Sequence, residues 1–427
     1  MNYPKILIIS HNALANNDNM GRTIASYIKK FPKECVAQLF LHEGNPNSNL
    51  CDNYYKFTDI DALKSILFRW HRGEVLRAVD SASLKASLQN GRVYHLGRKR
   101  KPLVSIAREM VWKFSNAFNK KLKSWLKAFN PDIVFFACSD YKYSYSLTRK
   151  ITNYLHKPLV LCCFDDFYIH CHYLNQFLGK FYYKCYMKEV HKTFREAKLT
   201  FAFNEEMAEA YAGLFKWKFP ILYTASDSFA DEVAFDEKKG ISYLGGLGYD
   251  RDKQLVALGK ALKCLHVDGI PKYIDVYSPE NRPDILRNLT IENGIVFHGA
   301  VSHDKVTRII SCSQAIIHVE SFDKAMSERT KYSLSTKIAE SLASGTLLIA
   351  FGPKEVASIK YLARHESAIV SDNIDDLISK LSVAIRNPDR YNEIVKKAKQ
   401  LYFLNHTTES VSKVFLSEIS KAIDTFC

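Results

Sequence analysis

Short apolar runs recur along the chain, and each is followed by a polar or glycine-containing loop and then by residues at helical spacing. In the first half the runs are Lys5–Ser10, Val36–Leu41, Pro131–Ala137, Pro158–Cys163 and Lys198–Phe203. In the second half they are Ile241–Leu244, Tyr273–Tyr277, Ile295–His298, Ala315–Val319, Thr346–Phe351 and Ser367–Ser371. Continuous apolar runs alternating with helices are typical of buried parallel strands. The pattern predicts an α/β protein with two facing Rossmann-like, doubly wound domains and a cleft between them.

A polar stretch at 224–240 separates the two series of strands, as expected of an interdomain linker. We therefore predict a first domain over 1–228 and a second domain over 239–404. A helix over about 405–427 is expected to pack back on the first domain. Between these elements, 45–61 and 320–334 are predicted to be loops, and 62–90 carries a helical pattern.

The stretch Leu334–Gly345 has the features of a short helix that precedes a buried strand. Ser335 is expected to cap its first turn through its side chain, and Gly345 suits the left-handed position after it. Lys337 and Glu340 are three residues apart and project from neighbouring positions. A helix N-terminus beside a lysine attracts phosphate, so Ser335, Thr336 and Lys337 are candidate diphosphate contacts. The alternative is an ordinary capped surface helix.

Glycines also follow the first strand of the second half, where Gly245-Gly246-Leu247-Gly248 leads into a predicted helix. Such glycines let a phosphate approach the backbone, and Arg251 and Lys253 can supply positive charge. The run is not a full G-x-G-x-x-G, so a nicotinamide-dependent dehydrogenase that binds ribose through Asp275 is a weaker alternative.

In the first half, the strand that ends at Cys163 is followed by Asp165, Asp166 and His170. Ligands collect at the carboxyl ends of strands in this architecture, so the two carboxylates are candidates for substrate contact or general base. Their alternative role is loop capping. Adjacent carboxylates on an extended backbone point in opposite directions and no third ligand is apparent, so we predict no metal site.

The formal net charge of +15 is concentrated, since Gly91–Lys127 holds eleven Lys or Arg residues and one acidic residue, Glu109. This balance favours an anionic partner. Within the stretch, Arg98–Lys101 is a charge cluster, and Val111–Phe129 has an amphipathic pattern with Trp and Phe on the apolar side. A basic amphipathic helix suits an anionic membrane surface; a crossover helix packed on the sheet, with a solvated basic face, is the favoured alternative.

Two observations limit the class of protein. No apolar run is long enough to cross a bilayer, and the ten scattered cysteines contain no Cys-x-x-Cys. We expect a cytoplasmic protein that is peripheral at the inner face of the cell membrane. A nucleic-acid-binding protein would explain the charge but not two nucleotide-type halves, so no nucleic-acid partner is predicted.

The second half resembles the family 4 glycosyltransferases of the GT-B fold. The resemblance is carried by Ser335–Ala350, which is similar to that family's small residue, Lys, apolar residue, Glu, Ala-x-Gly and strand. It implies that Glu340 holds the nucleotide ribose and that Ser335–Lys337 meet the diphosphate. Val296–Gly299 is similar to the family's short strand and glycine, whose loop lies near the base, which implies a role for His298. In the first half, Gly21 and Arg22 match the first loop in outline.

The sequence departs from the family pattern at two places. Gly246 stands where the family has an arginine after Gly245, so the cations must be Arg251, Lys253 or Lys337. Tyr332 stands where many members have a second glutamate, and Glu320 or Glu328 is expected to replace it. With Gly21, Arg22 and His170, Glu320 is therefore a candidate contact of the donor sugar or acceptor.

The resemblance implies transfer of a sugar from a nucleotide diphosphate donor to an acceptor hydroxyl, with retention. Asp165, Asp166, Arg251 and Lys337 are the candidate catalytic residues. No cofactor or metal is expected, since these cations can stabilise the leaving diphosphate. The basic segment suggests a lipid-linked glycan acceptor in bacterial surface polysaccharide synthesis, such as a capsule or lipopolysaccharide precursor. The alternative within the same fold is a nucleotide-sugar 2-epimerase.

Overall fold

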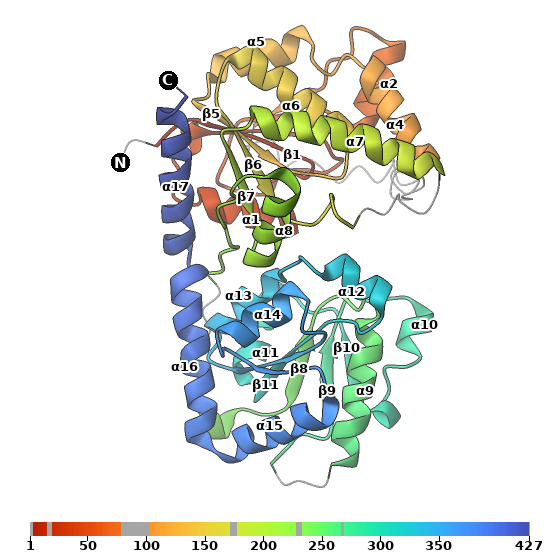
Figure 1. Cartoon of the computed structure of the whole chain (residues 1–427), viewed down its shortest axis with the longest axis vertical. Coiled ribbons are helices and arrows are strands. Elements are labelled where there is room, and N and C mark those ends of the chain that lie inside the picture. Colours follow the sequence, from red (N-terminus) through yellow and green to blue (C-terminus); the bar gives the residue numbers. More distant parts are fainter. Residues whose placement is uncertain are drawn as a thin grey trace. The chain divides into compact units, whose positions relative to one another are not determined.

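A computed structural model describes residues 3–14, 19–77, 102–170, 177–227, 233–265 and 269–426. The chain divides into two compact α/β units (Figure 1). Unit 1 consists of Met1–Leu222 and Val411–Cys427, and unit 2 of Tyr223–Ser410. Each has helices around one central sheet, so two Rossmann-like domains are present, as the alternation of apolar runs predicts.

Unit 1 has a seven-stranded sheet in the order β4-β3-β2-β1-β5-β6-β7. The strands are β1 (Ile6–Ser10), β2 (Val36–Phe40), β3 (Tyr54–Lys56), β4 (Glu74–Leu76), β5 (Ile133–Ala137), β6 (Leu159–Cys163) and β7 (Leu199–Ala202). All neighbours are parallel except β3 and β4. Every residue of β1, β2, β5 and β6 is buried, which explains why these strands are apolar throughout.

The helices of unit 1 connect these strands and cover the sheet. They are α1 (Asn19–Ile28), α2 (Asp59–Leu67), α4 (Pro102–Phe114), α5 (Lys120–Phe129), α6 (Lys142–Leu155), α7 (Phe177–Glu196), α8 (Glu205–Phe215) and α17 (Thr408–Asp424), with a 3₁₀ helix at Lys33–Cys35. α2 packs on α4, and α4 packs on α6 and α7. Asn204 caps α8 through its side chain, which accepts a hydrogen bond from the Met207 N–H.

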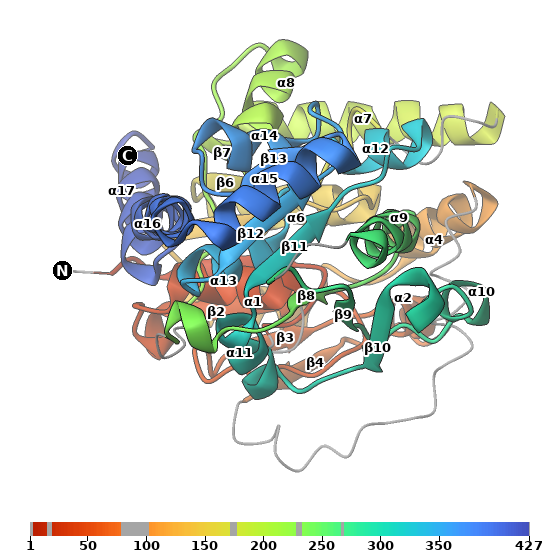
Figure 2. The same ribbon diagram turned by 90° about the horizontal axis from the view of Figure 1, so that it is seen from below.

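Unit 2 has a six-stranded parallel sheet in the order β10-β9-β8-β11-β12-β13. Its strands are β8 (Ile241–Leu244), β9 (Ile274–Tyr277), β10 (Ile295–Gly299), β11 (Ala315–Val319), β12 (Leu347–Phe351) and β13 (Ile369–Ser371). Its helices are α9 (Arg251–Cys264), α10 (Pro283–Leu286), α11 (His303–Cys312), α12 (Lys324–Thr330), α13 (Thr336–Ala343), α14 (Ala357–Arg364), α15 (Ile374–Arg386) and α16 (Pro388–Asn405), with 3₁₀ helices at Phe235–Glu237 and Ile291–Asn293. α9 and α15 lie on one face of this sheet, and α11 and α13 on the other (Figure 2).

Three short elements differ from the expectation. β3 lies in the predicted loop at 45–61, β4 follows α2 within the predicted helical stretch at 62–90, and α12 lies in the predicted loop at 320–334. The strands β3 and β4 have three residues each, too few to show a period, and they form because they pair with the edge of a sheet. Residues 78–90 of the predicted helical stretch lie outside the described residues.

The favoured alternative for Val111–Phe129 is confirmed for α5, whose apolar side chains are buried. Trp125 and Leu126 lie in the core, as do Leu122 and Phe129, while the lysines of α5 face outward. The prediction is wrong for Phe114, which is 63% exposed. The charge cluster Arg98–Lys101 lies outside the described residues. In the part of the chain that is described, no helix is long and apolar enough to cross a membrane.

The last helix, α17, belongs to unit 1 although the chain reaches it through α16 of unit 2. Phe415 is fully buried, and its ring lies 5.6 Å from that of Tyr27 and 5.4 Å from that of Phe135. The rings of Phe31 and Phe201 are each within 6.2 Å. One aromatic side chain therefore attaches the C-terminal helix to the first sheet.

Phe415→Ala is expected to destabilise unit 1 by about 3–5 kcal/mol, because it leaves a cavity among four aromatic rings. All four tryptophans of the chain (Trp70, Trp112, Trp125 and Trp217) lie in unit 1, so denaturation followed by tryptophan fluorescence reports on this unit. Val414→Ala, at a neighbouring position that is 43% exposed, is the control and should change stability by less than about 0.5 kcal/mol. Equal effects of the two variants would contradict the role of Phe415.

Candidate functional site

The strand order places one candidate site in each unit. In unit 2 the chain leaves β8 toward β9 on one side, and later returns to β11 on the other side of β8. The loops after β8 and β11 must therefore diverge, which leaves a crevice at the carboxyl ends of these strands. In unit 1 the same reversal occurs between β1 and β5.

At the unit 2 reversal, Gly245 follows β8 and the first turn of α13 approaches it. A Cβ placed on Gly245 would lie 2.8 Å from Lys337 Nζ and 3.0 Å from the Tyr243 hydroxyl oxygen. The Tyr243 hydroxyl donates to the Gly246 carbonyl oxygen (2.7 Å) and holds the turn. Glycine at 245 thus permits the close approach of an ammonium group to the backbone. The structure thus brings Gly245 and Lys337 together, and their role as diphosphate contacts stays a prediction.

Arg251, the first residue of α9, forms an ion pair with Glu320, which follows β11. The guanidinium Nη2 lies 2.9 Å from one carboxylate oxygen and 3.2 Å from the other, and Nε donates to the Val319 carbonyl. The side chain of Glu320 is 3% exposed, and His318 Nε2 lies 3.3 Å from it. Two residues expected to contact the donor therefore contact each other and join the two loops of the crevice.

Burial by itself would raise the pKa of Glu320, but the hydrogen bond from His318 and the charge of Arg251 outweigh burial and lower it. Burial by itself would lower the pKa of Arg251, but the negative charge of Glu320 outweighs the effect of burial and raises it. Both groups are therefore charged at neutral pH. The charge of Arg251 is therefore compensated by Glu320, and Lys337 is a second, exposed cation at the crevice.

The other residues that were predicted to contact the nucleotide-sugar donor differ in their exposure and in their partners. Lys253 is 66% exposed and pairs with Asp250 (2.8 Å). Thr336 and Glu340 lie on α13 with Lys337 and are partly exposed. His298 lies at the irregular end of the edge strand β10, where it stacks on Tyr277 and approaches Asp275 (2.7 Å). Asp275 is the second residue of β9 and not its last, which disfavours the dehydrogenase alternative.

The expected side-chain cap at Ser335 is not formed. A side-chain cap would accept a hydrogen bond from the N–H of Ile338. That N–H donates instead to the carbonyl oxygen of Ser335 (3.0 Å). The other end of the helix agrees with the prediction, since Gly345 has a φ of +69°.

The loop after β6 places Asp166 in a structural position. Its carboxylate accepts hydrogen bonds from the N–H groups of Tyr168, Ile169 and His170 and from the Tyr211 hydroxyl, and it lies 2.9 Å from His170 Nδ1. Its side chain is 2% exposed. This arrangement is the loop-capping alternative for Asp166, whereas Asp165 is exposed. Gly21 and Arg22 lie in the first turns of α1, which follows β1.

The unit 1 reversal contains a cluster of residues that sequence reasoning missed. His11 follows β1, His42 follows β2 and Tyr141 follows β5; the ring of His11 lies 4.8 Å from His42 and 4.9 Å from Tyr141. The Arg108 guanidinium lies 4.1 Å over the Tyr141 ring and pairs with Asp59 (2.7 Å). The signal available in the sequence was a histidine directly after each of the first two strands.

Burial lowers the pKa of both histidines, and the neighbouring charge of Arg108 lowers it further. Both imidazoles are therefore neutral at neutral pH. His11 Nδ1 is buried and has no hydrogen-bond partner among the described residues. Within the same residues, no group of three His, Cys, Asp or Glu side chains is arranged to hold a metal ion.

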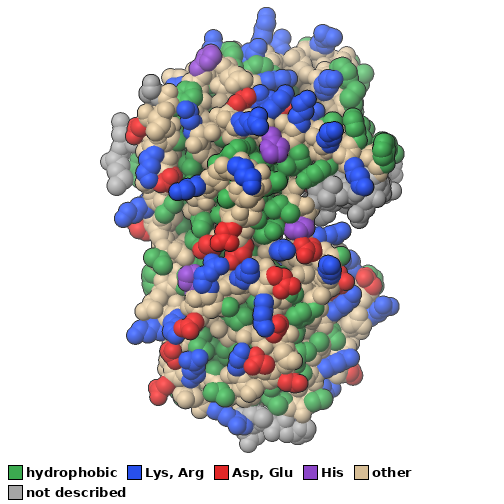
Figure 3. All heavy atoms as spheres, in the orientation of Figure 1, with side chains coloured by type: hydrophobic (Ala, Val, Ile, Leu, Met, Phe, Trp, Pro, Cys, Tyr) green, Lys and Arg blue, Asp and Glu red, His purple; other side chains and the backbone are tan. Residues whose placement is uncertain are grey.

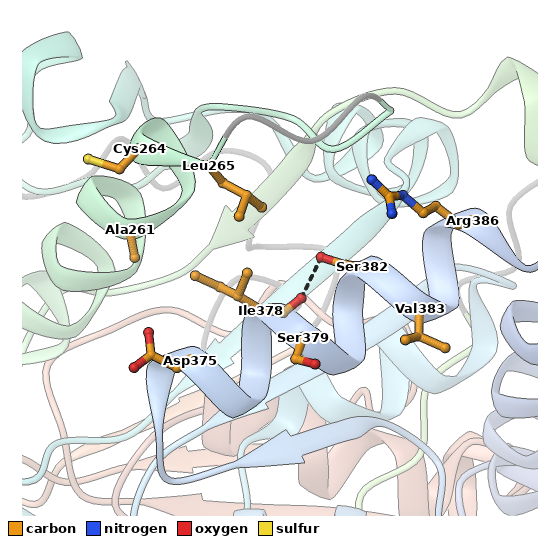
Figure 4. Close-up of a pocket in the computed structure, with 9 residues that line it drawn as sticks. All are labelled: Ala261, Cys264, Leu265, Asp375, Ile378, Ser379, Ser382, Val383 and Arg386. Carbon is orange, nitrogen blue, oxygen red and sulfur yellow. Dashed lines mark hydrogen bonds between the residues drawn. The ribbon is translucent and has the colours of Figure 1, made fainter.

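A separate groove of about 620 Å³ lies between α9 and α15 (Figure 4). Ala261, Cys264 and Leu265 line it from the C-terminal end of α9, and Ile378 and Arg386 line it from α15. The N-terminus of α9 at Arg251 is thirteen residues away, which is roughly 20 Å along the helix. The groove is therefore distinct from the crevice at the carboxyl ends of the strands.

Comparisons with known proteins bear on the fold and on the second half of the chain. Residues 267–417 match the family model described as "Glycosyl transferase-like". Among solved structures, HepE from Anabaena in complex with UDP has a TM-score of 0.63 at 9% identity, over 98% of this chain and 100% of that chain. The chain has the GT-B fold. No curated protein sequence matches the chain significantly.

Two further GT-B structures have similar scores. The UDP-forming α,α-trehalose-phosphate synthase from Burkholderia xenovorans, in complex with glucose-6-phosphate, has a TM-score of 0.62 at 10% identity, over 98% of this chain and 100% of that chain. Sucrose-phosphate synthase from Thermosynechococcus elongatus has a TM-score of 0.61 at 10% identity, over 99% and 100%. The predicted resemblance to GT-B glycosyltransferases is confirmed; membership of family 4 stays a prediction.

Glu320→Gln is expected to destabilise unit 2 by about 2–3 kcal/mol at neutral pH, because it leaves the Arg251 charge uncompensated. This is below the usual cost of breaking a fully buried pair, since the Arg251 side chain is 22% exposed. Because the pKa of Glu320 is lower in the folded than in the unfolded state, its carboxylate stabilises the fold at pH values above the unfolded pKa. This stabilisation is lost as the pH falls through the folded pKa, so the stability difference between Glu320→Gln and the unmodified protein should shrink in acid. Calorimetric melts would measure it, with the more exposed Glu328→Gln as the control; equal melts would contradict the role of the pair.

Glu109 gives a second pH-dependent prediction. Burial beside α6 raises its pKa from 4.5 to about 7. Because the pKa of Glu109 is higher in the folded than in the unfolded state, its contribution to the free energy of unfolding is greatest at pH values below the unfolded pKa. This contribution falls by about 3 kcal/mol in total as the pH rises toward 7. Glu109→Gln keeps an acceptor for the Tyr143 N–H and should remove this slope, which tryptophan-monitored denaturation at several pH values would measure. An unchanged slope would contradict the assignment; Glu74→Gln, at an exposed position, should leave the slope in place.

Proposed function

We propose that the protein is a glycosyltransferase that takes a sugar from a nucleotide diphosphate donor bound in unit 2. The observation that carries the proposal is the approach of Lys337 Nζ to Gly245 at the strand-order reversal. An ammonium group, a glycine turn and the N-terminus of α13 meet there, and all three favour a diphosphate. The match of residues 267–417 to the glycosyl transferase-like family supports the same role.

In the proposed reaction the glycosidic bond to the diphosphate breaks and negative charge develops on the leaving group. Lys337 and the first turn of α13 stabilise that charge, which is the interaction expected to dominate catalysis. Arg251 acts as a positioning residue, because its pair with Glu320 holds the loop after β11 against the start of α9. Glu340, one turn further along α13, is the proposed ribose contact.

The acceptor is proposed to bind in unit 1 at the cluster of His11, His42, Tyr141 and Arg108. Tyrosine and histidine rings provide flat surfaces for a sugar, and a neutral imidazole can accept a proton from a hydroxyl group. We propose His42 and His11 for this role in place of Asp166, whose oxygens already hold the loop after β6. Retention of configuration and a lipid-linked glycan acceptor are part of the proposal.

A thermal-shift series with UDP, GDP, ADP and CMP tests the donor site first, because a ligand that binds the folded state raises its melting temperature in proportion to occupancy. One nucleoside diphosphate should stabilise the protein. The solved HepE complexes contain UDP and UDP-glucose, so UDP is the first choice. Stabilisation by none of the four would contradict the proposal.

Lys337→Ala is expected to lower kcat/KM for the donor by about 10²–10³, since it removes one preorganised cation at the leaving group. Lys354→Ala is the matched control, because Lys354 is 79% exposed in the same unit and pairs with Asp372. Both variants should melt like the unmodified protein in the absence of nucleotide. Equal activity of the two variants would contradict the site, and nucleotide release with sugar epimerisation in the absence of acceptor would favour an epimerase.

A further inference from the structure

Helix α4 presents apolar side chains to solvent on a face that the core does not use. Leu103 is 67% exposed, Met110 46% and Phe114 63%, and Ala107 between them is exposed as well. Their spacing places them on one stripe along the helix. Arg108 and Trp112 lie on the other side, where both bond Asp59. The apolar stripe is therefore separate from the side of α4 that packs against the rest of unit 1.

The two helices α2 and α7, which pack on α4, expose apolar side chains as well. α2 packs on α4, and at its end Leu67 is 70% and Trp70 73% exposed. α7 packs on α4 as well, and in its first turns Phe177 is 85% and Phe181 60% exposed. We call the exposed side chains of Asp59–Trp70, α4 and Phe177–Lys188 the α4 face. Eleven of the 22 exposed large apolar side chains in the described part of the chain belong to it.

The α4 face is also basic. Lys64, Arg69, Lys113, Lys180 and Lys184 are exposed on it. Among the described residues of its three segments no acidic side chain is exposed in the same way: Asp59 pairs with Arg108, Asp61 pairs with His71, and Glu109 is largely buried. Figure 3 shows the same excess of Lys and Arg over Asp and Glu on the visible side of unit 1 (upper half).

This combination specifies the chemistry of the partner. An exposed apolar surface of this extent marks an interaction site. A nucleic acid would neutralise the lysines but leave the Phe, Leu and Trp side chains in water. Insertion of apolar side chains at the head-group level, with lysines beside anionic lipid phosphates, satisfies both features.

We propose that the α4 face binds the surface of an anionic lipid bilayer. Phe114, Phe177, Phe181 and Trp70 enter the head-group region, and the lysines pair with lipid phosphates. The location overlaps only in part with the segment Arg98–Lys127 expected from sequence. It includes α4 from that segment, but the apolar residues of α5 are buried, and the contributions of Asp59–Trp70 and α7 lie outside it. The proposal does not rest on glycosyl transfer, because the donor site lies in unit 2.

Trp70 allows a direct test. The full-length protein is mixed with vesicles of phosphatidylcholine alone or with phosphatidylglycerol added, and floated on a density gradient. It should float with the anionic vesicles only, and lipids brominated near the head group should quench part of its tryptophan fluorescence. Trp70→Phe should float equally but lose most of that quenching, since Trp112 and Trp125 are buried and Trp217 follows α8, outside the segments of the α4 face. Failure to float, or quenching unchanged in Trp70→Phe, would overturn the proposal.

A pair of triple variants locates the surface. Leu67→Ser, Phe177→Ser and Phe181→Ser together should weaken vesicle binding by at least about tenfold, because each removes apolar area from the lipid. Lys120→Ser, Lys121→Ser and Lys127→Ser on α5 should weaken it by less than about threefold. Circular dichroism melts check that both variants fold. Greater loss in the α5 variant would overturn the proposal, and so would a lipid-free dimer that the first variant dissociates.

Discussion

The reversal of strand order is the constraint on which both candidate sites depend. A parallel strand buried on both faces must be followed by a crossover that covers one face, and successive crossovers in opposite directions cover opposite faces. At the strand where the direction changes, neighbouring loops part. His11 and Tyr141 meet at that point in unit 1, and Gly245, Arg251 and Glu320 meet there in unit 2. The side chains of each site come from short loops, and the order of the strands determines where those loops diverge.

Electrostatic compensation then distributes the roles within unit 2. Arg251 and Glu320 are both charged and hold each other, so their net effect on a distant anion is small. Lys337 is exposed, and its ammonium lies beside a residue with no side chain. The Arg251–Glu320 pair thus joins the two loops, and Lys337 places a further positive charge beside the Gly245 turn. This arrangement suits a site that must bind a diphosphate and release it again.

Helix α4 links the candidate site of unit 1 to its surface. On its inner side, Arg108 stacks over Tyr141 and Glu109 accepts a hydrogen bond from the Tyr143 N–H. On its outer side the same helix carries Leu103, Met110 and Phe114. Helix α4 therefore exposes apolar side chains on its outer side, where the helix of a globular domain usually carries polar ones.

The sequence by itself determined what depends on neighbouring residues. The buried strands, the cap at Asn204, the left-handed Gly345 and the shared side of Lys337 and Glu340 follow from local sterics and periodicity. Only the tertiary structure decided what each face meets. It paired Arg251 with Glu320, 69 residues later, brought the Tyr211 hydroxyl to Asp166, and buried the apolar side of α5 while exposing an apolar stripe of α4. Periodicity shows which side chains share a face, but the partner of that face is set by contacts between distant parts of the chain.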